Sequence, residues 1–222
     1  MKTLLNRWNT IWLRPLTDGE ALKVLDGYNK TRYSRRKKQE GLLELASREA
    51  HEKQEVYFAT ILNDDGSPYC AIESNVGYFG LNFLQSNYIH YLTFQYQEER
   101  NQNGKLFLTA IFLYECNPGT DKRIRRIDFS YTHQGGFSTV IYQGEMIDGT
   151  YEEITAEHPP ISKEELEKLL VDYPKFGEYD QLIRLDRIPL QARERILEYT
   201  DKEFPAFREY LQRDIECYQK TK

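Results

Sequence analysis

Residues 105–116, KLFLTAIFLYEC, are almost continuously apolar and lie within a run of strand-like segments from Glu55 to Gly144. The run is rich in Tyr, Phe, Ile, Leu, Val and Thr, which suit a pleated, half-buried surface. Turn-forming sequences separate the segments and no helix-length segment interrupts them, so we expect hairpins and a mostly antiparallel sheet. The segments are EVYFATILN (55–63), PYCAIESN (68–75), GYFGLNFLQ (77–85), NYIHYLTFQYQ (87–97), KLFLTAIFLYEC (105–116), RIRRIDFSY (123–131) and FSTVIYQGE (137–145).

The apolar segment 105–116 is expected in the middle of the sheet. A strand that is apolar on both faces is typical of a sheet covered on both sides. We therefore predict that Phe107, Ala110, Phe112 and Leu113 belong to the buried centre. Helices from the two ends of the chain are the expected covers.

The region before the sheet, residues 1–54, is predicted to be helical. Leu4, Leu5, Trp8, Ile11 and Trp12 have the spacing of one helical face, which predicts a helix over residues 4–16. The segment 17–20, TDGE, fits a capping box and predicts a second helix that ends near residue 29. A third helix is expected to dock through the leucines of residues 42–45.

The region after the sheet, residues 150–222, is expected to be an acidic connector followed by helices. Ser162 and Glu165 form a second capping-box pattern, which predicts a short helix that stops before Pro174. A last helix is predicted from about Asp201 to Gln219. The predicted fold class is α+β, with a mostly antiparallel sheet of about six or seven strands flanked by N-terminal and C-terminal helices in a single domain, 1–222.

The bulk composition is that of a globular chain that needs neither disulfides nor metal. The 222 residues include 40% hydrophobic and 29% charged residues, with a net charge of −5. The three cysteines form no CxxC pair, and the four histidines are far apart, so we expect no metal site and no cofactor. No apolar run is long enough to span a membrane, and the N-terminus lacks the features of a signal peptide. We expect a cytoplasmic protein.

The sequence contains no motif that is characteristic of a catalytic activity, so we predict no catalytic residues. GxSxG and P-loop sequences are absent. Glu73 and Glu115 lie in aromatic-rich strands, and either becomes a candidate acid or base if it faces inward. The basic run 35–38, RRKK, could contact phosphate groups, but glutamates follow it closely and the chain is acidic overall, so nucleic-acid binding is not expected.

The general character of the chain is similar to that of bacterial immunity proteins, which neutralise a toxin. It is small, acidic and Tyr-rich, and it lacks catalytic motifs. This likeness implies a binding protein that occludes the active site or substrate groove of a partner with a basic surface. One alternative is a small hydrolase or transferase with a site on the sheet; another is a nucleic-acid-binding or regulatory protein.

The segment 151–180 is the predicted binding surface, because carboxylates alternate there with aromatic residues. Carboxylates alone are typical of a solvated face, whereas aromatics among them are typical of anchors with a charged rim. The alternatives are that this segment merely caps the sheet and that the interface is the exposed face of the Tyr-rich sheet. The predicted partner-binding residues are Glu164, Glu167, Asp172, Tyr173, Phe176, Glu178 and Tyr179.

Overall fold

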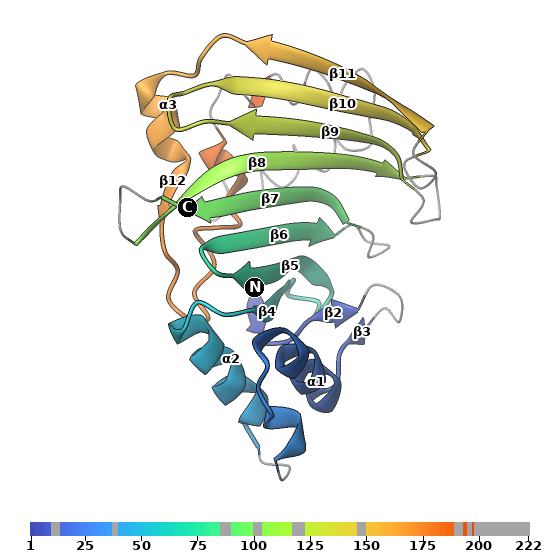
Figure 1. Cartoon of the computed structure of the whole chain (residues 1–222), viewed down its shortest axis with the longest axis vertical. Coiled ribbons are helices and arrows are strands. Elements are labelled where there is room, and N and C mark those ends of the chain that lie inside the picture. Colours follow the sequence, from blue (N-terminus) through green and yellow to red (C-terminus); the bar gives the residue numbers. More distant parts are fainter. Residues whose placement is uncertain are drawn as a thin grey trace.

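The computed structural model describes residues 1–9, 14–36, 40–84, 90–99, 104–116, 123–145 and 150–188, together with residues 193, 194 and 197. Ten strands form one antiparallel sheet in the order β1-β4-β5-β6-β7-β8-β9-β10-β11, and β12 pairs with β8 beside this path (Figure 1). The strands are β1 (Lys2–Leu4), β4 (Tyr57–Leu62), β5 (Pro68–Asn75), β6 (Tyr78–Leu84), β7 (His90–Glu98), β8 (Lys105–Cys116), β9 (Arg123–Tyr131), β10 (Phe137–Glu145), β11 (Thr150–His158) and β12 (Leu170–Asp172).

The mostly antiparallel sheet is confirmed, but it is larger than the six or seven strands predicted. The additional strands are β1, β11 and β12, from regions predicted to be helix or connector. β1 pairs with β4, and β12 pairs with β8, across long sequence separations that local patterns do not reveal. β11 is the last strand of the sheet, and most of its side chains are exposed. It therefore lacks the alternation of apolar and polar residues by which strands are recognised in a sequence.

The helix predicted over residues 4–16 is wrong. β1, β2 (Trp8–Asn9) and β3 (Arg14–Pro15) occupy the part of this segment that the structure describes. Asn6 is buried between them, its side-chain amide donates to the Leu16 carbonyl at 2.5 Å, and its own carbonyl accepts from the Thr60 hydroxyl at 2.8 Å. These long-range pairings override the local helical spacing.

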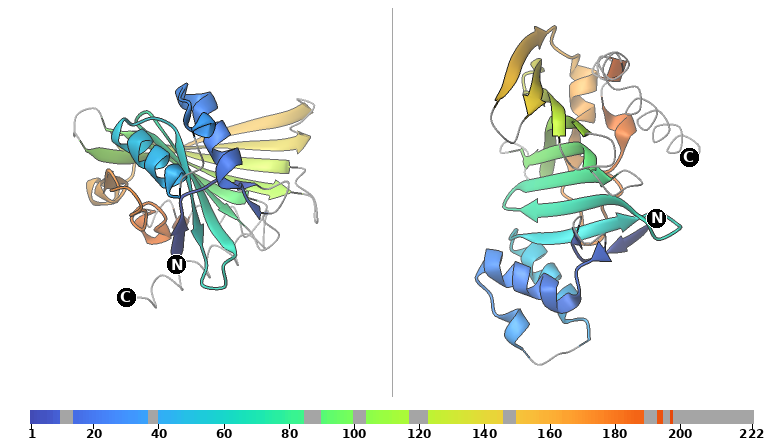
Figure 2. Two further views of the ribbon diagram at one scale, coloured as in Figure 1. Left: turned by 90° about the horizontal axis from the view of Figure 1, so that it is seen from below. Right: turned by 90° about the vertical axis from the view of Figure 1, so that its right-hand side faces the viewer.

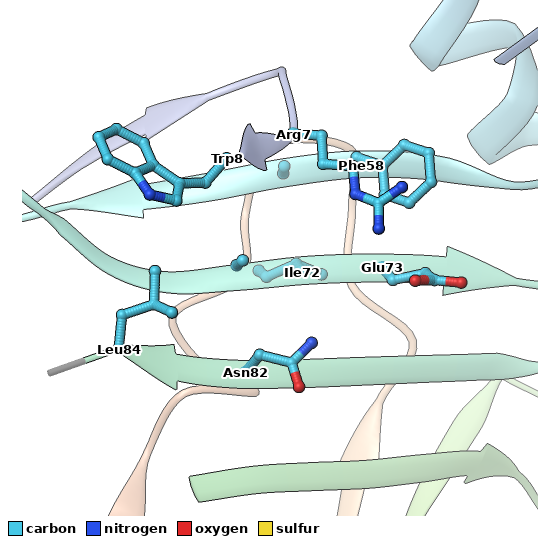
Figure 3. A pocket seen from close by; sticks show the side chains of 9 residues that line it. Arg7, Trp8, Phe58, Ile72, Glu73, Asn82 and Leu84 are labelled. Atoms are coloured by element: carbon cyan, nitrogen blue, oxygen red, sulfur yellow. The ribbon is translucent and has the colours of Figure 1, made fainter. Parts of the chain in front are cut away.

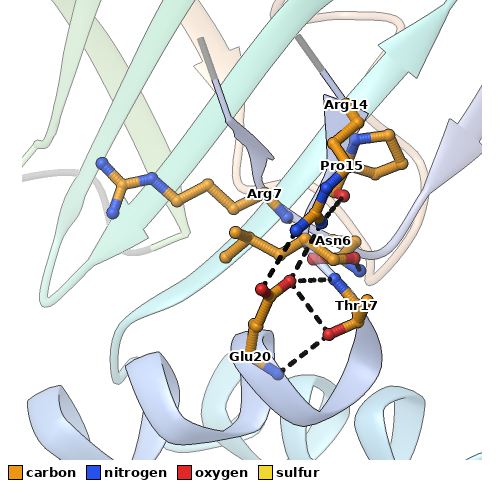
Figure 4. A network of polar contacts seen from close by, with 7 residues as sticks. Asn6, Arg7, Arg14, Pro15, Thr17 and Glu20 are labelled. Atoms are coloured by element: carbon orange, nitrogen blue, oxygen red, sulfur yellow. Dashed lines mark hydrogen bonds and ion pairs between the residues drawn. The ribbon is translucent and has the colours of Figure 1, made fainter. Parts of the chain in front are cut away.

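The capping box at the start of α1 (Asp18–Asn29) is confirmed, and it also holds β3. The Glu20 carboxylate accepts from the Thr17 backbone N–H at 2.7 Å, and Thr17 Oγ1 accepts from the Glu20 N–H (Figure 4). The Arg14 guanidinium donates to both oxygens of the same carboxylate at 3.0 Å. These contacts lower the pKa of Glu20 to about 2, so α1 and the β2–β3 hairpin are tied together at neutral pH.

The two longer helices gather near one end of the sheet instead of flanking it. α1 and α2 (Leu42–Glu52) lie beside β4 in Figures 1 and 2, whereas the short α3 (Lys163–Lys168) lies near the β10–β11 end in Figure 1. Two 3₁₀ turns complete the elements, η1 (Tyr33–Arg35) and η2 (Leu185–Arg187). The helix predicted at residues 201–219 lies outside the described residues.

One face of the sheet, here called the core face, carries the hydrophobic core. Ile72, Leu81, Phe94, Ile111 and Phe129 are successive cross-strand neighbours on it, and none is more than 2% exposed. The segment from Ile161 to Ile188, here called the C-terminal strap, runs behind the sheet in Figure 1 and buries its own apolar side chains against this face. Burying these side chains is the main stabilising contribution of the fold.

Strand β8 shows that only part of the central-strand prediction is right. Phe107, Ala110 and Leu113 are buried as predicted. Phe112 is only partly exposed to solvent but points to the opposite face, where it is outside the hydrophobic core. The strand is apolar on both sides because its second face also carries aromatic residues, and not because both faces are covered.

Candidate binding surface on the open face

The second face of the sheet, here called the open face, is the candidate functional surface. In Figures 1 and 2 no described segment covers it, apart from the N-terminal hairpin and α1 near β4. Strand alternation brings a polar and aromatic set to it, because every residue next to a core-face residue points the other way. One cross-strand row is Ala71, Asn82, Thr93, Phe112, Asp128, Val140 and Thr155; the next contains Tyr114, Arg126, Tyr142 and Glu153.

An arginine stacked between aromatic rings lies at the centre of the β8–β11 half of this face. The Arg126 guanidinium carbon is 4.6 Å from the Phe112 ring centroid and 5.2 Å from that of Tyr142. Tyr142 in turn meets Tyr151 edge to face, with 5.4 Å between the centroids. The four residues come from β8, β9, β10 and β11, and we call them the arginine–aromatic cluster. Cation–π stacking and the rings' amphipathic character suit a surface that is both exposed and preorganised.

The arginine is held in place by a buried carboxylate. Arg126 donates through Nε and Nη2 to the two oxygens of Asp128, whose side chain is 10% exposed against 34% for Arg126. Burial raises the pKa of Asp128, and the Arg126 contact offsets part of that effect. Burial likewise raises the pKa of Tyr142, so its hydroxyl stays protonated at neutral pH. The guanidinium is therefore fixed in orientation, with one side turned to solvent.

A pocket of about 200 Å³ lies on the same face near the other end of the sheet (Figure 3). Its apolar floor comes from β4 and β5, and Trp8 and Leu84 line one side. Pockets for drug-sized small molecules typically have about 300–1,000 Å³, so this one has room for about one side chain of a partner.

The charged groups of the pocket are available to a partner. The Arg7 guanidinium lies over the Phe58 ring at 4.9 Å, and Glu73 reaches in from β5. Among the described residues, neither side chain has a hydrogen bond or an ion pair. Glu73 thus faces the open face instead of the core, while the Glu115 side chain lies outside the described residues.

The outermost strand, β11, adds an acidic margin to the open face. Glu153 and Glu157 are exposed on this face, Glu152 is exposed on the opposite face, and none of the three forms an ion pair with a described residue. Tyr151 is 45% exposed on the open face, and Ile154 is 53% exposed on the opposite face. The margin therefore places carboxylates next to the aromatic rings of the arginine–aromatic cluster.

Within the predicted binding segment 151–180, the structure separates the carboxylates from the aromatic residues that are predicted to bind a partner. Glu164, Glu167 and Glu178 are exposed, as is Asp172, which pairs with Lys105 at 2.8 Å. The predicted aromatic residues instead turn toward the core face.

Tyr179 is 1% exposed, and its hydroxyl donates to the Tyr57 hydroxyl at 3.3 Å. Tyr173 packs against Phe79 with 5.3 Å between the centroids, and Phe176 lies 5.6 Å from the His51 ring. These rings fix the C-terminal strap to the sheet, so Tyr179 is not presented to a partner in this conformation. The arginine–aromatic cluster was missed as a set because only the register of four strands brings it together.

Metal binding, membrane insertion, thiol chemistry and the basic run are other features to assess in the part of the chain that the structure describes. No group of three or more His, Cys, Asp or Glu side chains there could hold a metal ion, and no helix there is long and apolar enough to cross a membrane. Cys70 is fully buried, and burial raises the pKa of its thiol. Arg36 of the basic run stacks on Tyr33 at 4.2 Å, whereas residues 37 and 38 lie outside the described residues.

Comparison with protein-family models, with curated proteins and with solved structures finds no match.

Proposed function

We propose that this chain is a binding protein of the bacterial immunity type, which neutralises a cognate toxin by covering the toxin's active site or substrate groove. In this proposal the chain is cytoplasmic, the partner is a toxin domain with a basic surface, and the interface is the open face with its β11 margin.

The observation that carries the proposal is the juxtaposition of Tyr142 and Tyr151 with the exposed carboxylates of Glu153 and Glu157. Partly exposed aromatic rings supply binding energy when a partner buries them, because they lose little side-chain entropy. Carboxylates around them attract a basic surface and speed association. The chain's net charge of −5 acts in the same direction.

The enzyme alternative receives less support from the same face. The one pocket described there is smaller than typical pockets for drug-sized ligands, and its charged groups lie at an open surface. A partner side chain inserted into this pocket, between Trp8 and the Arg7–Phe58 pair, fits the binding proposal instead.

The proposal is tested by growth of a bacterial host that expresses the toxin-like open reading frame neighbouring the gene for this chain. Co-expression of the wild-type chain should restore growth, and Tyr142→Ala combined with Tyr151→Ala should abolish the rescue. Absence of rescue by the wild-type chain would contradict the proposal.

Association kinetics of the purified pair then locate the interface. Glu153→Gln combined with Glu157→Gln should slow association by about tenfold at low salt and reduce its salt dependence. The matched control is Glu164→Gln combined with Glu167→Gln, which removes the same charge from α3. If only the α3 variant slows association, the interface includes α3 and not the open face.

A further inference from the structure

We infer that the outer edge of β11 is a strand-addition site, at which a β-strand of the partner with Lys or Arg opposite Glu153 and Glu157 extends the sheet. The inference rests on the proposed function, because it specifies how a basic partner would be held. Strand addition obtains affinity from main-chain hydrogen bonds and specificity from alternate side chains.

The hydrogen-bond register identifies the backbone groups that point outward. The Thr132 N–H donates to the Gly136 carbonyl at 3.0 Å, which makes these residues a hydrogen-bonded pair of β9 and β10. Such pairs alternate along an antiparallel ladder. The pair Ile127–Ile141 is therefore not hydrogen-bonded, and Ile141 directs its N–H and C=O toward Ile154 of β11.

The same alternation then applies along β11. Since Ile154 directs its backbone groups to β10, its neighbours Glu153 and Thr155 direct theirs away from the sheet. Tyr151 and Glu157 do the same, two residues further along in each direction. No described strand pairs with these groups.

This edge lacks most of the features that protect natural edge strands from further pairing, and its charged residues are glutamates, which do not disfavour a basic strand. Edges are typically short, or they carry Pro, Lys or a bulge that prevents further pairing. The opposite edge strand, β1, is three residues long and includes Lys2. β11 is nine residues long, contains neither Pro nor Lys, and pairs with β10 without a register shift.

The side chains of β11 define the strand that would fit. Glu153 and Glu157 project on the open face, so residues opposite them in an added strand are best Lys or Arg. On the other face Ile154 is 53% exposed and favours an apolar residue opposite. A second copy of β11 would bring three further glutamates and no Lys or Arg to the same edge, so a basic partner strand is favoured.

The first test uses a fluorescent nine-residue peptide as the probe, with Lys at the positions opposite Glu153 and Glu157 and Val opposite Ile154. Fluorescence anisotropy measures its affinity for the full chain. N-methylation of the peptide amides that face β11 should weaken binding by about tenfold or more, because main-chain hydrogen bonds are lost. Equal N-methylation of the amides on the peptide's other edge is the matched control and should leave binding in place. Absence of binding, or equal loss with both peptides, would overturn the inference.

The second test changes the protein at an outward backbone group. Thr155→Pro removes an N–H that points away from the sheet and keeps the ladder to β10, as Pro does on natural edge strands. Its affinity for the peptide should be about tenfold lower than that of Thr155→Val, which lacks the same hydroxyl but keeps the N–H. If Thr155→Pro fails to fold, the N-methylated peptides decide. A dimer in sedimentation that Thr155→Pro abolishes would show a self-association edge and overturn the partner-strand assignment.

Toxin rescue separates the two proposals. If Thr155→Pro still neutralises the toxin as well as Thr155→Val does, the inference is wrong while the proposed function stands. If the peptide binds as expected but the wild-type chain neutralises nothing, the proposed function is wrong while the edge remains a strand-addition site.

Discussion

The core face and the open face belong to the same strands, yet they carry different kinds of side chain. On the core face, Phe79, Phe83 and Phe94 have no solvent exposure. Phe83 and Phe94 meet edge to face, and Phe79 meets Tyr173 of the C-terminal strap in the same way. On the open face, Phe112 is partly exposed and an Arg126–Asp128 pair takes the place of aliphatic packing. Aromatic content alone therefore does not distinguish a core from an interface. The distinction depends on whether the ring is covered by other apolar side chains or lies beside charged groups and solvent.

Tyrosine illustrates the same difference. Tyr57 and Tyr179 are buried and satisfy each other's hydroxyls on the core face. Tyr142 and Tyr151 meet on the open face, where Tyr151 remains 45% exposed. An amphipathic ring suits both positions, because its body can be buried while its hydroxyl finds protein or water.

The largest expected effect comes from removing one phenylalanine from each face. Phe94→Ala should lower the free energy of unfolding by about 3–5 kcal/mol, because it leaves a cavity under the strap. Phe112→Ala should lower it by only about 1–2 kcal/mol, because a partly exposed ring contributes less burial. Chemical denaturation of both variants measures the difference. Equal losses would show that the open face is packed like the core.

A smaller effect is expected from the ion pair of the open face. Arg126→Met should destabilise the chain by about 1–3 kcal/mol, a value below that for a fully buried pair because Arg126 is about one-third exposed. The loss arises because Asp128 remains buried without its partner. Combining Arg126→Met with Asp128→Leu should recover most of it, as a double-mutant cycle would measure. No recovery would mean that the guanidinium's stacking on Phe112 matters more than its charge.

The smallest expected effect is a pH dependence on the core-face side. His51 Nδ1 lies 2.9 Å from the Tyr57 hydroxyl, and burial lowers the pKa of His51, with the nearby Arg48 acting in the same direction and Glu52 opposing. The unfolded chain protonates its histidines near pH 6.5, above the pKa of folded His51, so protonation favours unfolding as the pH falls through that range.

The melting temperature should therefore fall between pH 7.5 and 5.5, and it should fall less in His51→Gln. Thermal denaturation at several pH values provides the measurement. An identical fall in both proteins would assign the pH dependence to a group other than His51.

The sequence by itself determined the antiparallel sheet and the start of α1. Strand propensity, turn residues and the capping box at Thr17 and Glu20 act over a few residues, so they can be recognised locally. The positions of β5 to β10 follow from the same local rules, because each strand pairs with the next one along the chain.

Only the tertiary structure decided which face is covered and where the exposed aromatic residues meet. The sequence around Tyr179 is compatible both with an exposed ring that binds a partner and with a core residue. Its contact with Tyr57 in the folded chain makes it a core residue. Arg126, Tyr142 and Tyr151 become neighbours through the register of three strands, which no single stretch of sequence encodes. Burial and register are properties of contacts between distant segments, and a local pattern constrains them only after the pairing is known.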